Sequence, residues 1–193
     1  DRVQTAEEFS RAVPAFDYEA FKPYVERMFA GEESVTVPGK VSCYARSSGT
    51  TSDRSKYVPI TRHSILWNHT LGMRDVVALY HAAYPKTKLL QGRTLTLGGT
   101  CVEEGGNLVG DLSGILLHET THWGMSMRAP RIETALLADF DAKINRIADE
   151  CAAQRITAFA GVPSWNLELM RRVLEYTGKS NLLEVWPDME LFL

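Results

Sequence analysis

The sequence predicts an α/β fold with a mixed, partly parallel sheet and flanking helices. Three observations support this fold class. Segments with helical periodicity alternate with short apolar strands, a pattern typical of βαβ units. Apolar residues recur at helical spacing from Ile132 to Cys151, and a compact apolar strand at residues 156–160 follows directly. The chain has 193 residues, of which 45% are hydrophobic, so it is long enough to bury a substantial core.

The first half is predicted to contain helices around a central pair of strands. Thr5 begins a capping box with Glu8, which indicates the start of a short helix. A second helix is expected at residues 17–30, where Gly31 ends it. Two strands and a long helix ended by Pro85 complete this half, at residues 41–45, 57–60 and 61–84.

The second half begins with a strand at residues 94–97 and a glycine-rich stretch at 98–114. A long amphipathic helix is predicted at residues 131–154. After strand 156–160, Ser164 is expected to cap a helix that ends at Gly178. A last strand is expected at residues 189–193.

Composition narrows the class of protein. The formal net charge is −3, which argues against a nucleic-acid partner or an anionic membrane surface, because both require a basic excess. Three scattered cysteines indicate free thiols in a reducing, cytoplasmic compartment. No apolar run approaches the roughly 18 residues of a membrane span. The chain starts at Asp1 without a methionine, and its last residues fall within a predicted strand, so we expect a fragment of a longer protein.

The loop at residues 47–56 contains the clearest chemical signal. It is rich in hydroxyl groups, includes Gly49, and ends with two cations. Hydroxyls and free backbone N–H groups on a turn donate to phosphate oxygens, while a glycine lets the backbone approach the anion. The pattern is not a Walker A loop, because Arg54 and Ser55 replace its glycine and lysine. The candidate phosphate-binding residues are Ser47, Ser48, Gly49, Thr50, Thr51, Ser52, Arg54 and Lys56.

A different interpretation of this loop is a solvated hairpin, since Ser, Thr and Gly are common in any surface turn. The order of the residues favours phosphate binding. The run from Ser47 to Thr51, followed by Lys56 and a Tyr-Val-Pro-Ile-Thr strand, resembles the phosphate loop of the auxin-responsive acyl-acid amido synthetase family. Four further segments resemble its bacterial members in the same order, at residues 21–27, 110–115, 160–165 and 182–187.

This resemblance implies a function and a place in a larger enzyme. The family belongs to the acyl-adenylate-forming superfamily, so residues 1–193 are expected to be part of a large N-terminal adenylation domain, with the C-terminal domain absent. ATP with Mg²⁺ is expected to activate a carboxylic acid as an acyl-adenylate, and the acyl group then passes to the amine of an amino acid. Transfer to a thiol such as coenzyme A stays open. The isolated chain is expected to be inactive and to bind ATP at roughly millimolar level.

The resemblance also suggests where the acid binds. The acyl group is expected to lie against the helix at residues 61–84 and the turn at residues 161–165. The candidate substrate-binding residues are Arg74, Gly161, Val162, Pro163 and Trp165. Arg74 equally fits a solvent-facing side chain, and Trp165 equally fits a core position.

A competing motif runs from His118 to His122 and matches the zinc-protease pattern H-E-x-x-H. Two histidines four residues apart bind one Zn²⁺ only on a continuous helix. Two β-branched threonines between them and Gly124 just after them disfavour such a helix, and the expected third ligand is missing. No metal site is therefore predicted. The remaining non-enzymatic alternative is a nucleotide-binding remnant.

Overall fold

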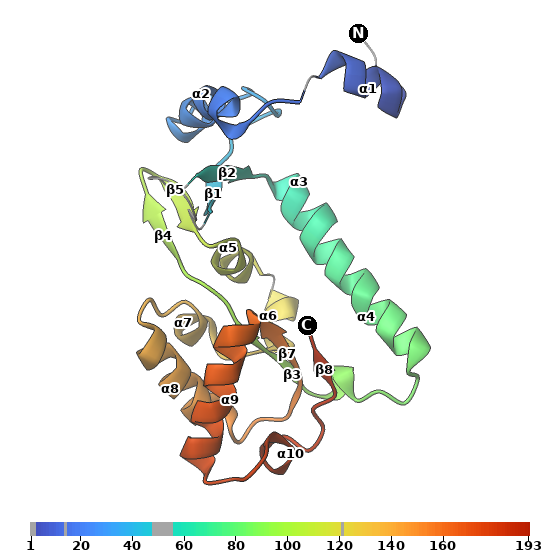
Figure 1. Cartoon of the computed structure of the whole chain (residues 1–193), viewed down its shortest axis with the longest axis vertical. Helices are drawn as coiled ribbons and strands as arrows, with labels where there is room; N and C mark the ends of the chain where they lie inside the picture. The colour runs from blue at the N-terminus through green and yellow to red at the C-terminus, as the bar shows by residue number, and fades with distance from the viewer. Residues whose placement is uncertain (1–2, 14, 48–55, 121) are drawn as a thin grey trace.

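A computed structural model describes residues 3–13, 15–47, 56–120 and 122–193 of the chain. In these residues the strands form two four-stranded sheets, one above the other in Figure 1. The upper sheet has the order β2 (Tyr57–Ile60), β1 (Cys43–Arg46), β5 (Asn107–Gly110) and β4 (Cys101–Glu104). The lower sheet has the order β6 (Arg128–Ala129), β3 (Arg93–Leu97), β7 (Ile156–Gly161) and β8 (Leu191–Phe192).

The predicted fold class is confirmed, and the strands divide between two sheets. The upper sheet is mixed, because β1 pairs parallel with β5 and antiparallel with β2, and β4 pairs antiparallel with β5. The lower sheet is parallel throughout. The segment from β3 to β4 passes from the lower sheet to the upper one (Figure 1). The sheets are therefore linked at the carboxyl end of β3.

Two helices cover the upper sheet. Helix α2 (Tyr18–Phe29) starts at Asp17, whose side chain accepts the Ala20 N–H at 3.0 Å, and buries Val25 and Met28 against the sheet. Helix α5 (Leu112–His118) buries Ile115 in a second cluster. Before them, α1 (Ala6–Ala12) shows the predicted capping box and has no buried residue.

The predicted long helix after β2 is continuous in direction and has three parts. These are α3 (Arg62–Ser64), the π-helical η1 (Ile65–Thr70) and α4 (Leu71–Ala83). None of the three contains a buried residue. In Figure 1 this helix runs from the upper sheet past the lower one, and Ile65 at the start of η1 packs against the cluster that contains Ala45 and Ile60 of the upper sheet.

The main core lies around the lower sheet. Helices α8 (Phe140–Cys151) and α9 (Pro163–Thr177) pack against it, with Trp186 after α10 (Leu182–Val185). The indole N–H of Trp186 donates to the Cys151 carbonyl at 3.1 Å, so this buried polar atom is satisfied. Gly178 ends α9 with φ of 66°, as predicted.

Two predicted boundaries are wrong. The helix expected at residues 131–154 is broken into α7 (Ile132–Ala135) and α8, because Asp139 caps α8 by accepting the Ala142 N–H at 2.7 Å. Helix α9 begins at Pro163 rather than after Ser164, with Val162 at the N-cap. Proline suits this first helical position, since its missing N–H would have no partner there.

The glycine-rich stretch contains regular structure that periodicity did not reveal. It forms β4, β5 and the start of α5. The short helix η2 (Leu89–Gln91) precedes it, and the short helix α6 (His122–Ser126) follows it. In the part of the chain that the structure describes, no helix is long and apolar enough to cross a membrane.

Candidate functional site

A groove opens at the carboxyl ends of β1 and β5. Because these neighbouring strands are parallel, the residues after both ends meet at one edge of the upper sheet. The cavity there has a volume of about 320 Å³. Its lining combines a cation, hydroxyls, a thiol, a carboxylate and bare backbone, from Arg46, Ser47, Thr100, Cys101, Val102, Val109, Gly110 and Asp111.

The two described ends of the predicted phosphate loop, Ser47 and Lys56, meet beside this groove. Strands β1 and β2 form the hairpin that holds this loop, and their last bonds join its two ends. The Ser47 N–H donates to the Lys56 carbonyl at 3.0 Å, and the Lys56 N–H donates to the Ser47 Oγ at 3.2 Å. The remaining predicted residues, Ser48, Gly49, Thr50, Thr51, Ser52 and Arg54, lie outside the described residues.

The two described cations near the loop have partners. The Arg46 guanidinium donates to Glu104 on β4 at 2.9 Å, and both side chains are more than two-fifths exposed. The Lys56 ammonium lies 5.2 Å from the centre of the Tyr18 ring, a cation–π contact. Tyr18 also donates its hydroxyl to the Tyr57 carbonyl at 3.1 Å, so helix α2 fixes the second strand of the hairpin.

Asp111 is a groove residue that the loop pattern did not reveal. It follows β5 at the N-cap position of α5, yet its side chain makes no capping bond. Its carboxylate instead accepts the Thr100 N–H at 3.3 Å and packs on Gly99, where a Cβ would collide with it. In the sequence, residues 110–115 carry a family resemblance and no indication of a role for Asp111; the signal that they offer is an aspartate directly after a strand.

A buried lysine contacts the backbone next to Gly99, on which Asp111 packs. Lys143 on α8 is 3% exposed, and its ammonium donates to the Gly98 carbonyl at 2.9 Å. Burial lowers the pKa of Lys143, and the negative charge of Asp111 acts in the opposite direction. Its spacing was an available signal, because Lys143 comes three residues after Phe140 and four before Ile147 and so lies on the apolar face of the helix.

The predicted turn at residues 161–165 lies at the carboxyl edge of the lower sheet. Leu97 and Gly161 are paired at the ends of β3 and β7, so Gly161 stands next to the segment that leads to the groove. A Cβ on Gly161 would lie 2.5 Å from the Leu97 carbonyl oxygen, so this close approach requires glycine. The carbonyl oxygen of the Asn166 side chain is buried here without a hydrogen-bond partner.

The sequence that forms this groove and this turn is similar to a known protein family. A model described as the GH3 family N-terminal domain matches residues 1–105, more than half of the sequence. The chain belongs to the GH3 family. It is 40% identical over 57 residues to "Indole-3-acetic acid-amido synthetase GH3.10" of Arabidopsis thaliana. It is 37% identical over 60 residues to "Probable indole-3-acetic acid-amido synthetase GH3.7" of Oryza sativa subsp. japonica.

Solved structures support the same fold. "GH3.15 acyl acid amido synthetase" matches with a TM-score of 0.62 at 16% identity, over 89% of this chain. "AtGH3.15 acyl acid amido synthetase in complex with 2,4-DB" matches with a TM-score of 0.64 at 17% identity, over the same share. The GH3 chain spans 31% of each solved protein, and the curated matches cover about 29–30% of this chain and 10% of each relative.

The other predicted substrate residues of the GH3 chain lie in different surroundings. Arg74 on α4 points its guanidinium to the adjacent Asp75, at 3.0 Å, and its side chain is 68% exposed. Trp165 on α9 is half-buried and packs on Phe140 with ring centres 5.6 Å apart. The described structure therefore groups Ser47 with Asp111 and Gly161 with Asn166, but it does not bring Arg74 to either pair.

The zinc-protease pattern does not form one helix. Helix α5 ends at His118, Glu119 is its C-cap, and a separate helix begins at His122. The His118 Nδ1 lies 3.1 Å from the neighbouring Glu119 carboxylate. No group of three or more metal-binding side chains occurs among the residues that the structure describes. The arrangement lacks the continuous helical turn that this zinc motif requires.

Proposed function

We propose that this GH3 chain forms the phosphate-binding part of an enzyme that uses ATP and Mg²⁺ to activate a carboxylic acid. The acid becomes an acyl-adenylate with release of pyrophosphate, and the amine of an amino acid then takes the acyl group to give an amide. The observation that supports this most directly is that Ser47, which bonds to Lys56 where the loop begins and ends, lines the same groove as Asp111. The names of the curated relatives agree with amide formation.

The groove has the donor set that such a substrate needs. A triphosphate requires hydrogen-bond donors and positive charge, and the groove offers the hydroxyls of Ser47 and Thr100 and the guanidinium of Arg46. Mg²⁺ in nucleotide sites binds to one or two carboxylates plus phosphate oxygens. Asp111 is the one carboxylate among the described residues that line this groove. The hydroxyls of the predicted loop, from Ser48 to Ser52, would add further donors, and Arg54 and Lys56 would add positive charge.

The chain's own residues would orient the reactants rather than exchange protons with them. Mg²⁺ held at Asp111 would supply positive charge for the leaving pyrophosphate, and the hydroxyls of Ser47 and Thr100 would donate hydrogen bonds to its phosphate oxygens while the carboxylate attacks the α-phosphorus. The segment from Gly98 to Thr100 connects the turn at Gly161 with the groove. It follows Leu97, which pairs with Gly161, and it ends at Thr100, whose N–H donates to Asp111. The acid is proposed to bind near the turn from Gly161 to Trp165, against the apolar helix α4.

The partners follow from this reaction. They are a small carboxylic acid and an amino acid, with no nucleic acid or membrane. Residues 1–193 are proposed to be a partial adenylation domain, so the other contacts to adenine and ribose belong elsewhere in the enzyme. Transfer of the acyl group to a thiol such as coenzyme A is the alternative for the second half-reaction. Product analysis with amino acids and with coenzyme A separates the two.

The test is carboxylate-dependent exchange of pyrophosphate into ATP by the full-length protein with Mg²⁺. A panel of aliphatic, aromatic and indole acids should include at least one that gives exchange above background. Ser48→Ala combined with Thr50→Ala should lower the exchange rate by roughly a hundredfold, since single donors to a developing anion are often worth that much. Ser10→Ala, on the exposed face of α1, is the matched control and should leave the rate unchanged.

A second measurement separates folding from function. Both variants should unfold at the urea concentration of the parent, because the changed side chains are small and polar. The proposal fails if no acid supports exchange, or if the double variant exchanges at the parent's rate.

A further inference from the structure

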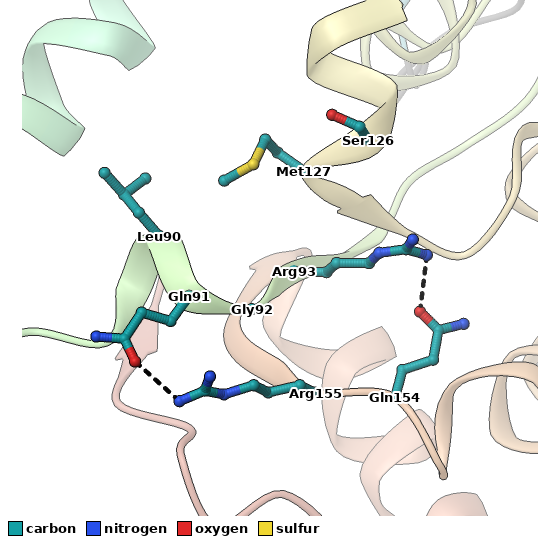
Figure 2. Close-up of a pocket in the computed structure, with 8 residues that line it drawn as sticks. All are labelled: Leu90, Gln91, Gly92, Arg93, Ser126, Met127, Gln154 and Arg155. Atoms are coloured by element: carbon teal, nitrogen blue, oxygen red, sulfur yellow. Dashed lines mark hydrogen bonds between the residues drawn. The ribbon is translucent and has the colours of Figure 1, made fainter.

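A second cavity lies at the opposite edge of the lower sheet, where β3 and β7 begin. Its volume is about 480 Å³, larger than that of the groove. Figure 2 shows Leu90 and Met127 pointing toward each other at one side and two arginines along the floor. Arg93 is the first residue of β3, and Arg155 directly precedes β7, so the parallel pairing places both at this edge.

Each of the two arginines donates a hydrogen bond to a glutamine that lies beside the start of the other strand. The Arg93 guanidinium donates to the side-chain carbonyl of Gln154 at 3.0 Å, and the Arg155 guanidinium donates to that of Gln91 at 3.0 Å. Figure 2 shows the two side chains running in opposite directions. A glutamine orients a guanidinium without neutralising its charge, so the Arg93 charge remains at the cavity, whereas Arg155 also shares Asp188 with Lys88.

The nearby carboxylates leave an excess of positive charge. Asp188 accepts from Arg155 at 2.8 Å and also pairs with Lys88, so one carboxylate serves two cations. Among the described residues, no carboxylate forms an ion pair with Arg93. Glu190, also at this edge, is engaged by the Thr87 hydroxyl and the Lys88 backbone N–H.

The floor between the arginines is kept bare by a packing constraint. Gly92 separates Gln91 from Arg93, and a Cβ there would lie 2.6 Å from both the Arg155 carbonyl oxygen and the Thr157 methyl. Any side chain at this position would push the strand starts apart. The cavity therefore has a small backbone floor with a guanidinium at each end.

We propose that this cavity binds a small anion with two negatively charged groups, phosphate or carboxylate, one at each guanidinium. The volume lies within the range of small-molecule sites. Two separated guanidiniums match two separated anionic groups better than a single one. Leu90 and Met127 provide apolar contact for a short linker between them.

The ligand of this cavity is not a reactant of the proposed reaction. Gly98 lies five residues after Arg93, which lines the cavity, and this step corresponds to roughly 16 Å at the usual rise per residue. The cavity is thus a separate site, and its occupant would influence the groove only through β3 and β7.

The experiment follows the side-chain amide signals of Gln91 and Gln154 by NMR during titration of the full-length protein. The probes are pyrophosphate, inorganic phosphate, succinate and acetate. Both amides should shift in a saturable way, and the two-group probes should bind roughly tenfold more tightly than the corresponding one-group probes. Comparison of pyrophosphate with succinate decides between a phosphate and a carboxylate ligand.

Three variants make the test specific. Arg93→Gln should weaken binding of the two-group probe by roughly tenfold or more, and Arg93→Lys should restore part of it. Arg171→Gln is the matched control, since Arg171 is an exposed arginine on α9 paired with Glu168. Ser48→Ala with Thr50→Ala should leave this binding unchanged, which separates the cavity from the proposed phosphate loop.

The proposal is overturned if none of the four probes shifts the glutamine amides in a saturable way. It is also overturned if Arg93→Gln binds as tightly as Arg171→Gln, or if binding is lost in the loop variant.

Discussion

Gly110→Ala should be among the most damaging single substitutions in this chain. Gly110 ends β5, where it pairs with Cys101 of β4 and Ala45 of β1 at the floor of the groove. A Cβ at this position would lie 2.5 Å from the Cys101 Cα and nearer still to the Thr100 carbonyl oxygen. Both obstacles are backbone atoms, so no change of rotamer relieves the collision.

The expected loss follows from the cost of overpacking. Extra methylene groups in packed sites cost about 1–3 kcal/mol, and the backbone obstacles place Gly110→Ala at about 3 kcal/mol. For a chain of this length, each kcal/mol lowers Tm by about 2–4 °C, so the variant should melt about 6–12 °C below the parent. Gly72→Ala is the control, because nothing lies within 4 Å of its Cβ and alanine is favoured inside helices.

Circular dichroism during heating and urea unfolding measures both variants. The groove is formed by β1 and β5, so pyrophosphate binding at the loop should weaken in Gly110→Ala as well. The steric argument is refuted if Gly110→Ala melts within about 2 °C of the parent, which corresponds to less than about 1 kcal/mol. A loss of stability in Gly72→Ala would show that the free space around an added Cβ does not predict whether alanine is tolerated.

Three further outcomes are expected. Burial lowers the pKa of Lys143, so between that lowered pKa and the ordinary value of 10.5 the unfolded chain binds more protons and stability rises with pH. Lys143→Met should remove this rise, and a stability difference between variant and parent that stays constant from neutral to alkaline pH would contradict it. Burial also raises the pKa of Cys151 to about 12. Iodoacetamide and mass spectrometry should therefore find Cys151 labelled only in denaturant, and labelling in the native chain at the rate of Cys43 or Cys101 would argue against this. Finally, elemental analysis should find no stoichiometric Zn²⁺, because His118 and His122 belong to different helices; one zinc per chain, lost in His122→Ala, would reverse that conclusion.

Local signals predicted the elements whose ends depend on neighbouring residues. The capping box at Thr5, the glycine stop at Gly178 and the strand before the long helix were all visible in the sequence. These features depend on contacts within a few residues, so short patterns are sufficient to identify them.

The break before α8 shows where periodicity is insufficient. Apolar spacing continues from Ile132 through Phe140, although α7 buries Thr134 and Ala135 while the α8 residues belong to the core around the lower sheet, and the spacing therefore suggested one helix. Asp139 at a cap position was the contrary signal, and it is easily overlooked inside a periodic run. The break is local, because Asp139 caps α8 and is itself exposed between the two helices.

The candidate site was only partly visible for a different reason. The loop 47–56 is contiguous, so its composition indicated phosphate binding, whereas Asp111 and Lys143 join it only through the pairing of distant strands and helices. Their roles depend on the parallel register of β1 with β5 and on the position of α8. No short pattern encodes such a meeting, and the cavity at Arg93 and Arg155 arises in the same way.

Helix α4 has a consequence for the dynamics of the chain. It has 13 residues and no buried side chain, and isolated helices of this length are only marginally stable in water. It continues directly from η1 and from α3, which Thr61 caps, and the segment that follows it is held by the contacts of Thr87 and Lys88 with Glu190. The amide hydrogens in its middle should therefore exchange with solvent through local opening, far faster than those of α8, which exchange only when the core opens. Hydrogen exchange in α8 should therefore report the free energy of unfolding of the core, whereas exchange in α4 should report only the local stability of α4.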